Sequence, residues 1–267
     1  MLFSFYSNVF AVDAATFSDF SSNFNNSSIN TITVQNDITL DLVNQRTNTI
    51  SIFGATGNER LTLNASFLRF KSDWNDDLYV IISSLTFSQG SNGSIELSGD
   101  GIGAHNFQLN SLVFIGNVSG SNGGAVYLHT QTQSPLPSDF FSLNSSVFTS
   151  NSALSGGALY MASNYSQNSI SFTITTGSFS QNKALAGNGG AISNEVGGGN
   201  TDNSFSISGI FIGNHASDCG GAVYSCVGKD GKFPYGGTNV YNLKGHFKGN
   251  GATNSGRAIY NYILKCI

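Results

Sequence analysis

The side chains best suited to chemistry are scattered along the sequence rather than grouped. The acidic residues Asp73, Asp76 and Asp77 form one cluster, in the stretch SDWNDD around Trp74. Carboxylates gathered in one loop could hold calcium or a sugar, but a solvated loop explains them more simply. The other acidic residues of interest occupy different positions relative to the repeats described below: Asp139, Glu195, Asp202, Asp218 and Asp230. We therefore expect neither the paired carboxylates of a glycosidase nor a metal site.

The histidines and cysteines also lack the arrangement of a catalytic site. The sequence contains four histidines and three cysteines: His105, His129, His215, His246, Cys219, Cys226 and Cys266. The histidines share no register and approach no Ser or Cys at the spacing of a nucleophile and its base, so we interpret them as loop or turn residues. Three cysteines make neither a disulfide framework nor a zinc signature, and the glycine-rich residues 194–200 lack the Lys-Ser/Thr of a phosphate loop. These observations predict no catalytic residue, no cofactor and no metal ligand.

Composition narrows the class of protein. Charged residues make up 10% of the 267 residues and the net charge is -4, so the chain lacks the basic surface of a nucleic-acid-binding protein. The 21 Phe and 10 Tyr supply the bulky apolar groups that a disordered chain lacks. Ser, Asn and Thr fill the polar positions, which suits a secreted or cell-surface protein. No apolar run is long enough for a membrane-spanning helix.

The main information in the sequence is an internal repeat. The pattern Phe-x-x-Asn recurs at a regular spacing, at Phe114/Asn117, Phe148/Asn151, Phe179/Asn182, Phe211/Asn214 and Phe247/Asn250. Subtracting the Phe numbers gives steps of 34, 31, 32 and 36 residues. The first four copies are each followed by Gly-Gly-Ala and an aliphatic residue, with glycines at Gly123, Gly124, Gly156, Gly157, Gly189, Gly190, Gly220 and Gly221. In the fifth copy Arg257 replaces the second glycine.

A third element precedes each Phe and extends the repeat toward the N-terminus. It is a pair of apolar residues two positions apart, found at Phe107/Leu109, Phe141/Leu143, Phe172/Ile174, Phe205/Ile207 and Tyr241/Leu243. The same pair at Val80 and Ile82, before Phe87, marks a sixth, degenerate unit. Each unit thus holds three short extended segments separated by Gly, Ser and Asn turns, without helical spacing.

Three strands in about thirty residues are what one coil of a parallel β-helix requires. A propeller blade needs four strands and about forty residues or more, and leucine-rich repeats would place Leu at fixed offsets. The alternating runs at residues 29–34, 38–42 and 49–52 predict three further coils. We therefore predict an all-β, single-stranded parallel β-helix, or β-solenoid, of about nine to ten coils.

This architecture assigns a structural role to each residue of the repeat. We expect each Phe to point inward and to stack on the Phe one coil away. The Asn three residues later can adopt a left-handed bend, bond the neighbouring backbone and form an amide ladder. The paired glycines permit a tight turn with positive φ and a close approach of backbones. After them, the aliphatic residue should face the core while the Ala and the following Tyr face outward.

The predicted organisation is one long domain after a short leader. Residues 29–267 form the β-helix, with the motif-bearing coils at residues 78–262. Residues 1–28 have two interpretations: the remnant of a secretory signal, because apolar residues precede Val12-Asp13-Ala14, or an N-terminal cap. The repeats run almost to the C-terminus and leave an edge that solenoids normally cap, as expected for a fragment of a longer protein.

The alternation of Phe-x-x-Asn with Gly-Gly-Ala-[Ile/Leu/Val] resembles the repeat pair of the chlamydial polymorphic outer membrane proteins and of related repeat-bearing surface proteins. The resemblance covers about residues 78–260. It implies a right-handed β-helical passenger that is exported, displayed at the cell surface in association with the outer membrane, and engaged in adhesion to host cells.

We therefore expect an exported adhesin or structural passenger without catalytic activity. Its partners would be a host-cell surface protein or a glycan, and not nucleic acid. Contacts with a partner are expected in the long turns between coils, at residues 130–139, 164–169 and 228–238. The alternative is a carbohydrate-active β-helix enzyme, a polysaccharide lyase or hydrolase, whose acidic site is assembled from loops.

Overall fold

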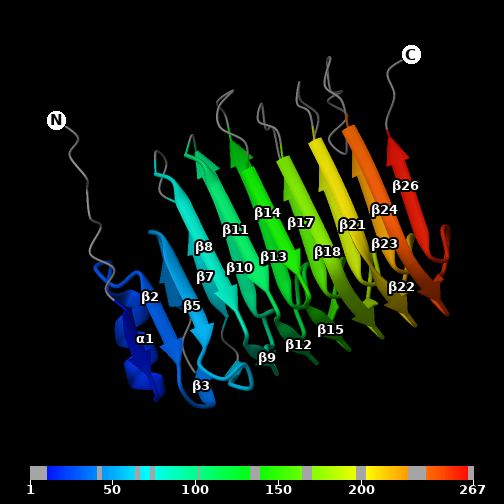
Figure 1. The fold of residues 1–267 in the computed structure, drawn as a ribbon. Helices are drawn as coiled ribbons and strands as arrows, with labels where there is room; N and C mark the ends of the chain where they lie inside the picture. Colours follow the sequence, from blue (N-terminus) through cyan, green and yellow to red (C-terminus); the bar gives the residue numbers. More distant parts are fainter. Residues whose placement is uncertain are drawn as a thin grey trace.

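The computed structural model describes residues 11–40, 44–63, 67–72, 76–101, 103–132, 139–163, 170–196, 203–227 and 239–263. Within these ranges the chain is almost entirely β-strand, wound into stacked coils (Figure 1). The near strands run down the view and those behind run up it, while the coils advance from the N-terminal to the C-terminal end. This is a right-handed winding, so the predicted all-β, right-handed parallel β-helix is confirmed.

Two of the three walls of the rod merge into one 14-stranded parallel sheet. The first wall contains β1 (Ala11–Ala14), β2 (Thr31–Val34), β5 (Ile50–Gly54), β8 (Leu78–Ser83), β11 (His105–Asn110) and β14 (Asp139–Asn144). The second contains β3 (Ile38–Leu40), β6 (Arg60–Leu63), β9 (Thr86–Ser88), β12 (Val113–Ile115) and β15 (Val147–Thr149). Three long strands run across both walls and so join them: β18 (Ile170–Ser180), β21 (Asn203–Ile212) and β24 (Asn239–Lys248).

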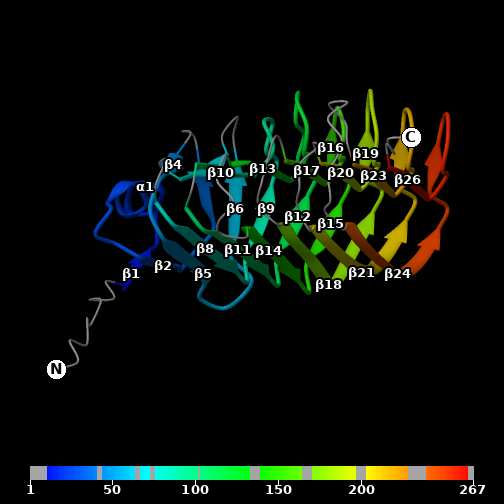
Figure 2. The same cartoon turned by 90° about the horizontal axis from the view of Figure 1, so that it is seen from above.

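The third wall is an eight-stranded parallel sheet. It contains β4 (Asn44–Arg46), β7 (Leu68–Lys71), β10 (Ile95–Gly101), β13 (Val126–Thr132), β17 (Leu159–Ser163), β20 (Ile192–Val196), β23 (Val223–Val227) and β26 (Ile259–Ile263). Between the second and third walls, four short strands form a sheet of their own: β16 (Ser152–Ala153), β19 (Lys183–Ala184), β22 (His215–Ala216) and β25 (Gly251–Ala252). Figure 2 shows the first wall along one side of the rod and the third along the other.

The described residues form eight full coils, from β2–β3–β4 to β24–β25–β26, and β1 adds one strand to the first wall. This is fewer than the nine to ten coils predicted. The runs at residues 29–34 and 38–42, predicted as separate coils, supply β2 and β3 of a single coil. A corner within a coil and a turn between coils look alike in sequence, because both are short and rich in Asn, Ser and Gly.

Alternate residues of each strand face the interior, except at the glycine corner, the turn formed by the paired glycines. In β8, Leu78, Val80 and Ile82 are fully buried and alternate with residues on the outer face. The alanines after the paired glycines are fully buried too, which contradicts the prediction that they face outward: Ala125, Ala158, Ala191 and Ala222. Two successive N–H groups, of Ala125 and Val126, donate to the same oxygen of Ala158, so regular alternation begins only after this corner.

Helix α1 (Phe17–Asn25) lies across the N-terminal end of the rod (Figures 1 and 2). The hydroxyl of Thr16 accepts from a backbone N–H of the first turn and caps the helix. Phe20 and Phe24 on its inner face are fully buried, and the ring of Phe24 meets Phe70 edge-on at 5.5 Å. The helix thereby covers apolar side chains that the first coils would otherwise expose.

A buried arginine ties this helix to the first coil. Arg46, at the end of β4, donates to the carbonyl oxygens of Phe24 at 2.6 Å and Asn26 at 2.9 Å, and also to that of Ile29. Burial lowers the pKa of the Arg46 guanidinium from its ordinary value. Strand β1 in turn pairs with β2, so the chain is part of the fold from Ala11 onward, while residues 1–10 of the predicted leader lie outside the described residues.

The only helix of the described ranges is α1, and none there is long and apolar enough to cross a membrane.

Candidate functional site

The Phe residues of the repeat form one internal column. Phe114, Phe148, Phe179 and Phe211 are fully buried, and Phe247 continues the column into the last described coil. The centroids of successive rings lie 4.8, 4.8, 4.9 and 4.7 Å apart, and the ring planes differ by at most 11°. Parallel aromatic rings at this spacing attract one another in addition to burying apolar area. The column therefore fixes the stacking register of the second wall.

The Asn residues form a buried amide ladder beside that column, made of Asn117, Asn151, Asn182, Asn214 and Asn250. The Oδ1 atom of Asn182 accepts from the backbone N–H and from Nδ2 of Asn151, both at 3.0 Å. Its Nδ2 donates to Asn214 Oδ1 and to the carbonyl oxygen of Phe148, both at 3.0 Å. Both hydrogens of the amide and its oxygen are thus paired inside the rod, as a buried polar group requires.

The left-handed bend of the repeat does not fall on the Asn, so that part of the prediction is wrong. It falls on the residue before it, with φ of 63°, 56°, 54°, 63° and 63° at Gly116, Ser150, Gln181, Gly213 and Gly249. The ladder requires each Asn side chain to point inward, so the preceding residue takes the bend.

The two glycines of each pair have different roles. The first has φ of 71°, 61°, 66° and 68° at Gly123, Gly156, Gly189 and Gly220. A Cβ on the second would lie 2.1, 2.2, 2.2 and 2.0 Å from a carbonyl oxygen of the next coil, at Gly124, Gly157, Gly190 and Gly221. The second glycine is therefore needed wherever another coil follows. Arg257 occupies this position in the last described coil and is exposed.

The acidic cluster does not form a metal site within the described residues. Asp73 and Trp74 lie outside them. Asp76 and Asp77 are exposed, and Asp77 Oδ1 accepts from the backbone N–H of Ala104 at 2.7 Å. No group of three or more His, Cys, Asp or Glu side chains in the described ranges is placed to hold a metal ion.

Two of the remaining acidic residues that the structure describes, Glu195 and Asp218, each have a partner of a different kind. Asp202 and Asp230 lie outside the described residues. Glu195 Oε2 accepts from the hydroxyl of Tyr160 at 2.7 Å, and Asp218 Oδ1 accepts from Asn254 Nδ2 at 2.8 Å. Tyr160 is 4% exposed, although it was expected to face outward.

Of the three cysteines, Cys266 lies outside the described residues and the other two form no disulfide. The Sγ atom of Cys219 lies 3.2 Å from Asp218 Oδ1. Burial raises the pKa of the Cys219 thiol, and the neighbouring Asp218 raises it further, so the thiolate is disfavoured.

Ser72, His105 and Asp139, which the sequence analysis did not group together, form a buried chain of hydrogen bonds. The ring of His105 lies between the other two, with Nε2 2.9 Å from Ser72 Oγ and Nδ1 2.7 Å from Asp139 Oδ1. This is the order of nucleophile, base and acid in serine hydrolases. However, Ser72 is 2%, His105 1% and Asp139 3% exposed, so a substrate cannot reach the Ser72 hydroxyl. This chain of hydrogen bonds therefore connects the end of β7 to the starts of β11 and β14 rather than forming an open active site.

A signal for this cluster was present in the repeat. His105 and Asp139 each stand two residues before an apolar pair, at Phe107 and Phe141, and so share a register. The prediction that the four histidines lie in loops or turns is wrong, since they lie in β11, β13, β22 and β24. In the sequence, a polar residue at a strand end resembles a loop residue when its hydrogen-bond partner lies in another coil.

Replacing Asp139 should change the pH dependence of stability. Burial raises the pKa of the Asp139 carboxyl, and the hydrogen bond and charge interaction with His105 offset this only in part. The folded state then holds the proton more tightly than the unfolded state, so this contribution to stability is lost as pH rises through the raised pKa. We expect the free energy of unfolding of Asp139→Asn, measured by urea denaturation from about pH 4 upward, to fall less with pH than that of the wild type.

Asp76→Asn, which removes one exposed carboxylate, controls for the change in net charge. Parallel pH profiles for Asp139→Asn and the wild type would contradict the prediction.

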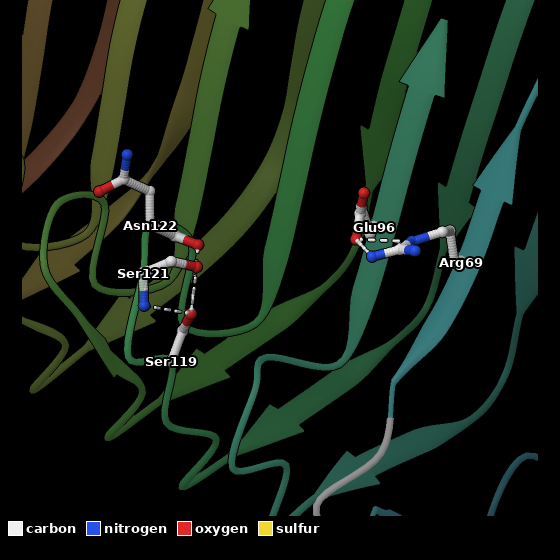
Figure 3. A network of polar contacts seen from close by, with 5 residues as sticks. All are labelled: Arg69, Glu96, Ser119, Ser121 and Asn122. Atoms are coloured by element: carbon white, nitrogen blue, oxygen red, sulfur yellow. Dashed lines mark hydrogen bonds and ion pairs between the residues drawn. The ribbon is translucent and has the colours of Figure 1, made fainter. Parts of the chain in front are cut away.

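The outer face of the third wall carries a different group of polar side chains (Figure 3). Arg69 on β7 forms an ion pair with Glu96 on β10, with Nε and Nη2 3.0 and 2.9 Å from Glu96 Oε2. The turn before β13 is closed by the hydroxyl of Ser119, which accepts from the backbone N–H of Ser121 at 3.1 Å. Glu96 and Ser121 line a hollow of about 190 Å³ together with Tyr127, and this hollow is a candidate binding site.

The repeat matches a known family of sequence repeats. The sequence pattern of the Chlamydia polymorphic membrane protein repeat matches residues 111–129, 176–195 and 208–226. Each match runs from the Phe strand through the glycine corner into the third wall. A search of curated proteins found no match. Among solved structures, "L. reuteri 53608 SRRP" aligns over 95% of this chain and 99% of its own at 11% identity, with a TM-score of 0.37, which is too low to bear on fold or function.

The predicted resemblance is therefore confirmed in three coils, which are built on the same Phe column, Asn ladder and paired glycines. The chain is a right-handed parallel β-helix in which three segments match the Chlamydia polymorphic membrane protein repeat.

Proposed function

We propose that this chain is an exported, cell-surface β-helical adhesin or structural passenger without catalytic activity of its own. The main support for the proposal is the repeat, because the three segments similar to a Chlamydia membrane-protein repeat lie in three of the stacked coils of the rod. The interior residues of these coils are alike, whereas the outward residues differ from coil to coil. A rod of this kind can vary its surface without disturbing its core.

The buried serine cluster supports the non-catalytic part of the proposal. Ser72, His105 and Asp139 have the hydrogen-bond order of a nucleophilic site, yet they are sealed from solvent. Catalysis needs an accessible nucleophile beside groups that stabilise the developing charge. These three side chains thus serve the packing of coils.

The proposal extends to the organisation of the chain and to its partners. Residues 1–28 would comprise a signal remnant and an N-terminal cap that includes α1, and residues 29–267 would form one β-helical domain. Partners would be a host-cell surface protein or a glycan. Of the turns expected to bind them, residues 133–138, 164–169 and 228–238 lie outside the described residues.

Adhesion can be tested with the purified chain. Beads coated with it should bind cultured epithelial cells saturably, and the soluble chain should compete for the same sites. Beads carrying an equal amount of heat-unfolded chain provide the control. Equal binding by the two kinds of bead would reject the adhesin and leave the structural passenger.

Surface display can be tested separately in the organism that makes the protein. Antibodies raised against the folded chain should stain intact cells. Staining that requires permeabilisation would reject a cell-surface location.

A further inference from the structure

The hollow on the third wall is built by three successive coils. It lies outside β7, β10 and β13, beside the turn that precedes β13, and measures about 190 Å³. Its walls include Phe67, Asn92, Glu96, Asn122 and Tyr127. Clefts that take drug-sized ligands measure roughly 300–1,000 Å³, so this one suits a ligand about the size of a single sugar ring.

An aromatic ring forms one side of the hollow. Tyr127 pairs with Tyr160 in the next coil, their rings 5.6 Å apart and within 2° of parallel. On its other side, Tyr127 is in register with Glu96 of the previous coil, which also lines the hollow. The ring face turned away from Tyr160 therefore borders the cavity. The negative face of an aromatic ring attracts the weakly positive C–H groups of an apolar surface, such as one face of a sugar.

Other contacts hold the polar groups of the hollow in place. The Glu96 side chain is 25% exposed, so its carboxylate is accessible while Arg69 holds it in place. The Arg69 guanidinium itself lies over the Phe67 ring, 4.9 Å from the centroid. The hydroxyl of Ser119 bonds both the backbone N–H and the hydroxyl of Ser121 at 3.1 Å, which sets the turn that carries Asn122 (Figure 3). Binding to groups already ordered avoids part of the entropy cost of association.

The charges of the hollow favour an uncharged ligand. Arg69 and Glu96 neutralise each other at 2.9 Å, so an anionic sugar would meet the Glu96 carboxylate without gaining a net positive charge. Carboxylate and amide groups instead suit the hydroxyls of a neutral sugar, which both donate and accept hydrogen bonds.

We propose that this hollow binds one neutral sugar residue of a glycan, stacked on Tyr127 and hydrogen-bonded by Glu96 and the amides of the rim. The inference rests on the proposed function and deepens it, since it names the chemical class of partner and the place on the rod where it binds.

Saturation-transfer NMR on the purified chain tests the inference, with D-glucose, D-galactose and N-acetyl-D-glucosamine as neutral probes and D-galacturonic acid as the charged one. At least one neutral sugar should receive saturation. Tyr127→Ala should weaken its binding by about tenfold or more, because the stacking surface is lost, and Glu96→Gln should weaken it as well. Tyr260→Ala is the matched control, since Tyr260 stacks on Tyr224 at 5.7 Å in the same row of residues but lies far from the hollow.

Three results would overturn the inference: no transfer to any neutral sugar, equal losses for Tyr127→Ala and Tyr260→Ala, or a preference for D-galacturonic acid. Circular dichroism of each variant shows that the rod is still folded. The bead assay distinguishes failure of the sugar site from failure of the proposed adhesin function. Adhesion that persists while no sugar binds overturns the sugar site alone, whereas sugar binding without adhesion overturns the adhesin alone.

Discussion

Phe141→Ala should lower the free energy of unfolding by about 3–5 kcal/mol, whereas Phe140→Ala should lower it by less than about 1 kcal/mol. Phe141 is 1% exposed and stacks on Phe172 at 4.9 Å, so the smaller side chain leaves a cavity that close-packed coils cannot fill. Phe140, the preceding residue of β14, is 37% exposed on the outer face. Urea denaturation followed by circular dichroism measures both values.

The pair is a sharp test because the two substitutions are the same and the positions adjacent. Similar losses for the two variants would mean that β14 does not alternate between core and solvent as the structure requires. Amide hydrogen exchange adds a second measurement. Because each coil contacts mainly its neighbours, Phe141→Ala should lower protection in β11, β14 and β18 first.

The architecture could be predicted from the sequence because the same residue types recur at one place in every coil. Phe114, Phe148, Phe179 and Phe211 lie in register in the structure, as their spacing in the sequence requires. A stacked coil repeats its environment, so it repeats its side chains. The coils before residue 78 lack the motif, and there the sequence could not separate corners from coil boundaries.

The details that escaped prediction depend on contacts across coils. The left-handed residue is Gly116 or Ser150 rather than the following Asn, because the Asn side chain is held by the coil above. The hollow at Glu96 and Tyr127 could not be predicted either, since these residues are unlike and only become neighbours when β10 pairs with β13. Core positions can thus be predicted from the periodicity of the sequence. A surface site made of differing residues has no such periodicity and cannot be predicted in this way.

The amide ladder should be as important to stability as the aromatic column. We expect Asn182→Ala to lower the free energy of unfolding by about 3–5 kcal/mol, because it removes four hydrogen bonds and takes away the oxygen that accepts from the buried backbone N–H and Nδ2 of Asn151. Asn106→Ala is the matched control. Asn106 is half-buried and its side chain bonds Gln108 at 3.2 Å, so the loss there should be about 1 kcal/mol or less.

Asn182→Asp tests whether the ladder acts through its donors. The new carboxylate keeps the shape and the accepting oxygen of Asn182 but cannot donate to Asn214 Oδ1 or to Phe148 O. Burial raises the pKa of such a carboxyl, and its protonated form regains one donor. The deficit relative to wild type should therefore be smallest at low pH and grow as pH rises through that pKa. A deficit independent of pH in urea denaturation would show that hydrogen bonding by this side chain does not hold the coils together.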